Sequence, residues 1–189
     1  MDVELVKKKT EEINNIFLQN KAGIESGETI VLFLDECHLL HGDLNGYVWG
    51  QSKIRIEVPI TNEKDRQTYF GALNYQSKEF HVQSHPSGHG KSTVKSIKYL
   101  QDKYKNRKII LIWDGASYHK YGEFRDCLLE VNGDKEPDEW SITCILFAPN
   151  TPQQNPVEDI WLQVKKFLSK YWYLCRSFKI VKFLERFFY

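Results

Sequence analysis

Three short apolar runs constrain the fold of this chain more than any other feature. They lie at 30–34, 109–113 and 142–148 of the 189 residues. In each run both alternating sets of side chains are largely apolar, which is typical of strands buried on both faces of a sheet. We therefore expect these three strands to lie centrally in a sheet that is covered on both sides.

The remaining segments complete an α/β pattern. Alternating or β-rich residues predict further strands at 53–60, 67–75 and 78–83. Helical periodicity predicts helices at 3–19, 92–105, 119–131 and from about 156 onward. Strands that come first and then alternate with helices favour an α/β fold in which helices flank both faces of a mixed central sheet.

An acidic residue directly follows two of the apolar runs. Asp35 comes after the run at 30–34, with Glu36 beside it, and Asp114 comes after the run at 109–113. In open α/β sheets, sites form beyond the carboxyl ends of such strands. The sequence therefore predicts that both strands end at these aspartates and that the two carboxylates border a site. Because side chains alternate along a strand, Glu36 is expected to face away from Asp35.

A third acid follows the last apolar run. Asn155 can cap a helix whose first residue is Pro156, and Glu158 then falls in its first turn. The spacing Asn-x-x-Glu also fits a capping box, in which the Glu158 carboxylate bonds back to the cap. If instead the three acids meet, they repel one another unless a cation lies among them. Carboxylates that hold two divalent ions are the arrangement used for phosphodiester cleavage.

Four motifs of the chain resemble the catalytic core of mariner-superfamily transposases. The likeness is strongest to the bacterial insertion-sequence branch, whose members are called DDE superfamily endonucleases. It covers about residues 28–170, and the motifs stand in the family order. They read FLDECHL at 33–39, Trp49-Gly50, WDGASYHK at 113–120 and LFAPNTPQQNPVEDIWLQVKKFL at 146–168.

This resemblance implies a ribonuclease-H-like fold with a catalytic and metal-binding triad of Asp35, Asp114 and Glu158. It implies two Mg²⁺ or Mn²⁺ ions, and cleavage and transfer of DNA strands at the ends of a mobile element, with a target DNA as the second substrate. The expected DNA-binding side chains are those of Lys91, His119, Lys165 and Lys166. We also expect two copies of the chain in the active complex.

The resemblance divides the chain into three parts. Residues 1–28 are an expected N-terminal helix and linker, 29–170 the catalytic domain, and 171–189 a basic, aromatic C-terminal helix or tail. The family normally carries a helix-turn-helix region that finds the element ends. The 30 residues before the first strand are too few for one, so a split transposase with a separate helix-turn-helix polypeptide is one interpretation.

Charge and composition agree with a nucleic-acid partner. The net charge is only +1, but residues 161–189 hold seven Lys or Arg and one acid. A basic, aromatic-rich segment beside an acidic body fits a phosphate-backbone partner, although a solvated helix face has the same composition. The four cysteines show no C-x-x-C spacing, and no apolar run is long enough for a membrane span. We expect a cytoplasmic, nucleoid-associated bacterial protein.

Other interpretations remain open. The chain could be a catalytically inactive, transposase-derived remnant that binds DNA or protein, or a ribonuclease-H-like nuclease with another nucleic-acid substrate. The segment SGHGKST at 87–93 resembles a phosphate-binding loop, but position 85 is His where that motif needs Gly. The histidines at 81, 85 and 89 recur every four residues, yet the intervening Pro and Gly residues oppose a helix. We expect them in a polar loop and not in a metal site.

Overall fold

The computed structural model describes residues 3–41, 49–53, 65–114, 122–149, 151 and 154–186. The strands are β1 (Thr29–Leu40), β2 (Arg66–Asn74), β3 (Phe80–His85), β4 (Lys108–Trp113) and β5 (Ile142–Leu146). The helices are α1 (Val3–Gln19), α2 (Lys21–Ser26), α3 (Gly90–Lys103), α4 (Glu123–Asn132), α5 (Pro156–Lys170) and α6 (Phe178–Glu185), with 3-10 turns η3 (Pro137–Glu139) and η5 (Trp172–Leu174). The strand expected at 53–60 falls almost wholly outside the described residues.

The described strands form one mixed five-stranded sheet in the order β3-β2-β1-β4-β5. β1, β4 and β5 are parallel, whereas β2 and β3 run antiparallel to their neighbours. The prediction that all three apolar runs lie centrally is wrong for β5, which is an edge strand of this sheet. Helices nevertheless cover both faces of β5, since Ile142 packs in one core cluster and Ile145 in another. An apolar run therefore indicates that both faces of a strand are covered, but it does not indicate the position of that strand within the sheet.

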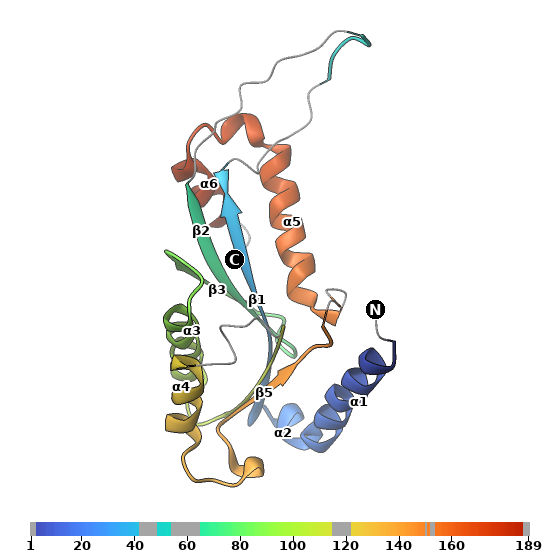
Figure 1. The fold of residues 1–189 in the computed structure, drawn as a ribbon, viewed down its shortest axis with the longest axis vertical. Coiled ribbons are helices and arrows are strands. Elements are labelled where there is room, and N and C mark those ends of the chain that lie inside the picture. Colours follow the sequence, from blue (N-terminus) through green and yellow to red (C-terminus); the bar gives the residue numbers. More distant parts are fainter. Residues whose placement is uncertain are drawn as a thin grey trace.

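Helices cover both faces of the sheet, as expected (Figure 1). On one face, Ile97 and Leu100 of α3 and Phe124 of α4 pack on the even-numbered residues of β1, such as Leu32 and Leu34. On the other face, α5 and α6 pack against Cys37 and Leu39, while α1 and α2 pack against Val31 and the neighbouring residues of β4 and β5. Among the described helices, none is long and apolar enough to cross a membrane.

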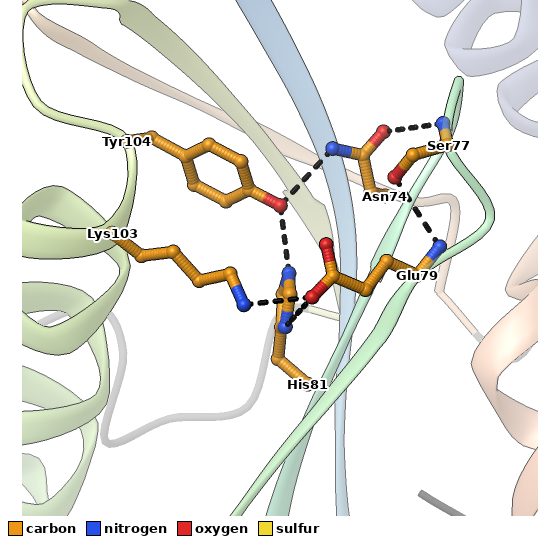
Figure 2. A network of polar contacts seen from close by, with 6 residues as sticks. All are labelled: Asn74, Ser77, Glu79, His81, Lys103 and Tyr104. Atoms are coloured by element: carbon orange, nitrogen blue, oxygen red, sulfur yellow. Dashed lines mark hydrogen bonds and ion pairs between the residues drawn. The ribbon is translucent and has the colours of Figure 1, made fainter.

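A polar network, part buried and part exposed, ties the hairpin between β2 and β3 to the end of α3 (Figure 2). The Nε2 atom of His81 lies 2.7 Å from the hydroxyl of Tyr104, which also accepts a hydrogen bond from Asn74 at 3.1 Å. Glu79 lies 3.6 Å from His81 Nδ1 and accepts a hydrogen bond from Lys103 at 2.7 Å.

The prediction that the histidines lie in a polar loop is wrong for two of them. His81 and His85 belong to β3 and are buried, and Nε2 of His85 lies 2.8 Å from the hydroxyl of Ser96 on α3. Ser96 of α3 and Tyr104, the residue that follows α3, supply the polar partners that a buried imidazole requires. The loop is shorter than expected, because α3 begins at Gly90.

Candidate active site

Asp35 lies inside β1 and not at its end, so the prediction that the strand stops at this acid is wrong. β1 pairs with β4 only as far as Phe33, and then continues to Leu40 beside β2. Beyond Phe33 the side chains alternate, with Cys37 and Leu39 buried and His38 and Leu40 exposed. That period of two suits a strand with one covered face. Asp35 thus sits where β1 and β4 separate, although its own strand goes on.

Asp114 follows β4 on the same face of the sheet. The preceding residues on that face, Ile110 and Ile112, pack with Val31 of β1. The parallel register pairs Phe33 with Ile112, so Asp35 and Asp114 each follow two residues later, where the two strands separate, and the Asp114 charge still acts on Asp35. Asp114 is exposed and Asp35 half-buried.

Glu158 reaches this place from the first turn of α5, which lies along β1 (Figure 1). Asn155 caps the helix by accepting a hydrogen bond from the Val157 N–H at 3.1 Å. Its amide nitrogen donates to the Leu34 carbonyl at 3.0 Å, so the helix start is held one residue from Asp35. Within the described part of the chain, the Glu158 carboxylate makes no bond back to the cap, so the capping box is not formed.

The carboxylates of Glu158 and Asp114 repel that of Asp35. The pKa of Asp35 is raised to about 8, first by burial, then by the charges of Glu158 and Asp114, and least by Glu36. A hydrogen bond to the Glu36 backbone opposes the shift. Sidechains from β1, from the end of β4 and from the start of α5 therefore form one acidic patch on the face covered by α5.

The chemistry of this patch fits a divalent cation. Carboxylate oxygens are the donors that Mg²⁺ and Mn²⁺ favour, and a cation offsets the repulsion that raises the Asp35 pKa. As the described side chains stand, no three His, Cys, Asp or Glu residues meet closely enough to hold an ion. Asp114 and Glu158 are exposed, so rotation about their side-chain bonds is open to both.

Comparison with known proteins decides the family. Residues 30–177 match the family model described as DDE superfamily endonuclease, which is most of the chain. The chain belongs to the DDE superfamily endonucleases. A search of curated proteins found no match.

Solved structures share the fold of this chain at low sequence identity. A pre-cleavage Mos1 transpososome matches with a TM-score of 0.63 and 13% identity over 100% of this chain and 56% of the other. A Mos1 transposase paired-end complex with left transposon end matches with a TM-score of 0.57 and 14% identity, over 89% of this chain and 50% of the other. A simian T-cell lymphotropic virus intasome, in complex with PP2A regulatory subunit B56 gamma, matches with a TM-score of 0.54 and 11% identity. This match covers 82% of this chain and 46% of the other. The ribonuclease-H-like fold is confirmed, and the chain spans about half the length of these structures.

Glu36 faces away from the acidic patch. Its Oε1 atom lies 3.5 Å from the hydroxyl of Thr93 on α3, and a Cβ added at Gly88 would stand 2.7 Å from its Oε2. These neighbours belong to the face of the sheet opposite α5. Glu36 therefore packs with α3, as side-chain alternation along β1 requires.

The side chains predicted to bind DNA do not all share one face. Lys165 and Lys166 are exposed on α5, and Lys165 lies near Cys37 on the patch side of the sheet. Burial raises the pKa of the Cys37 thiol to about 11, and the Lys165 charge opposes that rise. Lys91 is on α3, on the opposite face, with its Nζ 3.8 Å from Glu123. His119 lies outside the described residues.

The amide of Asn155 has a role that the sequence did not predict. The capping function follows from the Asn-Pro pair, but the bond to Leu34 joins residues 121 positions apart. No local pattern signals such a contact, because it depends on how α5 packs on β1.

Proposed function

We propose that this chain is the catalytic domain of a transposase that cleaves and joins DNA strands at the ends of a mobile element. The observation that carries the proposal is the gathering of Asp35, Asp114 and Glu158 on one face, where the pKa of Asp35 is raised to about 8. Strongly shifted carboxylates of this kind are typical of functional sites.

These three residues would hold Mg²⁺ or Mn²⁺, two ions in all. When bound, the ions supply Lewis acidity for attack on a phosphodiester. Asp35 is the fixed member of the set because it is half-buried within β1. Asn155 positions Glu158 by holding the start of α5 on Leu34.

In cleavage, a water oxygen bonds to phosphorus as the 3′ oxygen leaves and takes up a proton. In strand transfer, the freed 3′-hydroxyl loses its proton and its oxygen bonds to a phosphorus of the target DNA. The bond from that phosphorus to the target's own 3′ oxygen breaks, and the leaving oxygen takes up a proton. One of the Mos1 structures that share this fold is a paired-end complex with the left transposon end, which supports DNA as the partner. Lys165, whose charge acts on Cys37 on the patch side of the sheet, and the exposed Lys166 that follows it suit phosphate contacts.

Two parts of the proposal concern partners. Recognition of the element ends would come from a helix-turn-helix region outside these 189 residues, on the same or a separate polypeptide. The active complex would hold two copies of the chain, one for each end. Light scattering of the protein with and without DNA tests this stoichiometry, and a protein that stays a monomer on paired DNA ends contradicts it.

The central test compares Asp35→Asn, Asp114→Asn and Glu158→Gln with the unchanged protein. Each variant is expected to reduce Mn²⁺- or Mg²⁺-dependent nicking of a supercoiled plasmid at least about 1,000-fold, because each removes a charged ligand. Calorimetric titration with Mn²⁺ alone gives a second readout, in which each variant binds more weakly.

Matched control variants change the neighbouring acids. Glu36→Gln removes the charge next to Asp35, and Asp159→Asn removes the charge next to Glu158. Both variants are expected to retain nicking. Full activity in any one of the three triad variants contradicts the assignment. A protein that binds DNA, but neither nicks it nor binds Mn²⁺, is instead a transposase-derived remnant. Cleavage of an RNA–DNA hybrid in place of DNA indicates a different nuclease.

A further inference from the structure

One side of α6 carries a row of cations with an aromatic ring among them. Lys179, Lys182, Phe183 and Arg186 are spaced i, i+3, i+4 and i+7, so they share one side of the helix. All four are exposed, and 59% of Phe183 is accessible to solvent. The adjoining side of α6 is buried with α5 and the sheet. The row is therefore presented outward by a helix that is itself fixed to the core.

These side chains line a cavity of about 370 Å³. Its other walls are formed by the sheet, through Gln67 and Tyr69 of β2 and Ser84 of β3. Glu185 is the one acid in the lining, and it is buried. With three cations against one acid, the cavity favours an anionic ligand.

The cavity opens on the same face of the sheet as the acidic patch. Asp35 pairs with Gly71 of β2, and the same register pairs Cys37 with Tyr69 and Leu39 with Gln67. Tyr69 and Gln67 are two and four residues beyond Gly71, or about 7 and 13 Å along the strand. At the ~3.4 Å per nucleotide of a strand stacked as in duplex DNA, that separation corresponds to roughly two to four nucleotides, and to fewer where the strand is extended.

We propose that this cavity, the α6 cleft, binds a single-stranded segment of the DNA substrate a few nucleotides from the phosphate that is cleaved. Lys179, Lys182 and Arg186 contact successive phosphates, and the Phe183 ring stacks on a base. Single-strand sites combine cations that follow the backbone with exposed aromatic rings, and both are present here. A fully paired duplex offers no base face to Phe183. The inference rests on the proposed function, since it takes the acidic patch as the place of cleavage.

The test measures binding of a fluorescent 16-nucleotide single strand by the whole chain, in EDTA, by anisotropy. The triple variant K179Q/K182Q/R186Q is expected to raise Kd at least about ten-fold at 0.1 M salt. It should also reduce the slope of log affinity against log salt by about two, because each lost phosphate contact contributes ~0.7. F183A is expected to raise Kd for the single strand about five-fold or more, with a smaller effect on a duplex of the same sequence.

Matched control variants lie on the opposite face of the sheet. K95Q/K98Q/K105Q removes the same charge from the region of α3, and L129A removes an apolar side chain on α4 that is exposed to the same extent as Phe183. The proposal is overturned if the α6 and α3 triple variants lose affinity for the single strand equally, or if F183A binds it as tightly as the unchanged chain does. It is also overturned if the unchanged chain does not bind the strand. Binding in EDTA needs no cleavage. A negative result in the binding test therefore does not affect the nicking test of the triad. Likewise, a protein that does not nick DNA can still show whether the α6 cleft binds a single strand.

Discussion

At the scale of single residues, His81 links protonation to stability. Burial lowers the pKa of His81, the Lys103 charge lowers it further, and Glu79 partly opposes both. A group whose pKa is lowered by folding binds its proton more tightly in the unfolded chain. The free energy of unfolding is then highest above the unfolded pKa of about 6.5, and it decreases as the pH falls below that value.

We therefore expect His81→Gln to weaken the decrease in stability between pH 7 and pH 5. Gln can still reach the Tyr104 hydroxyl but does not titrate, so the slope should fall by up to ~1.4 kcal/mol per pH unit. Part of the slope should remain, because burial also lowers the pKa of His85. Urea unfolding at several pH values measures this, with the exposed His38→Asn as control. An unchanged slope in His81→Gln contradicts the assignment.

At the scale of elements, Asn155 joins α5 to β1 and is expected to position Glu158. Asn155→Ala removes both hydrogen bonds, so the free energy of unfolding should fall by about 1–3 kcal/mol and kcat for nicking at least ten-fold. Asn132→Ala is the matched control. Asn132 is also buried, and it joins the end of α4 to Ile142 through two hydrogen bonds away from the acids. Its loss should cost similar stability but leave kcat unchanged. Equal kcat losses in both variants indicate a purely structural role.

The elements were predictable where a pattern is local. The helical periodicity of α1 and the apolar run of β4 predict where these two elements begin and end, because each pattern lies wholly within its element. The length of β1 was missed, although Cys37 and Leu39 alternate with polar residues in a readable way. The edge position of β5 could not be read, since strand order is set by long-range pairing. Asp35 and Asp114 could be placed near each other because β1 and β4 are parallel, although Asp35 lies inside its strand and not at the predicted end.

At the scale of the whole molecule, the acidic patch opposes the stability of the fold that supports it. Asp35 is half-buried beside Glu158 and Asp114, and its pKa is raised to about 8. Near neutral pH, folding without a cation therefore costs free energy at this position. Sites that serve function are often destabilised in this way, and removal of the buried charge then stabilises the protein.

We therefore expect Asp35→Asn to be more stable than the unchanged protein in EDTA. The gain should reach about 2 kcal/mol at pH 8, or roughly 4–8 °C in Tm for a chain of this length. Mn²⁺ should raise the Tm of the unchanged protein and have little effect on the variant, since the cation offsets a repulsion that the variant lacks. Calorimetry in EDTA and in Mn²⁺ measures both effects, with Glu36→Gln as control. A destabilised Asp35→Asn in EDTA would mean that this carboxylate supports the fold, and the three acids would then be structural partners and not a cation site.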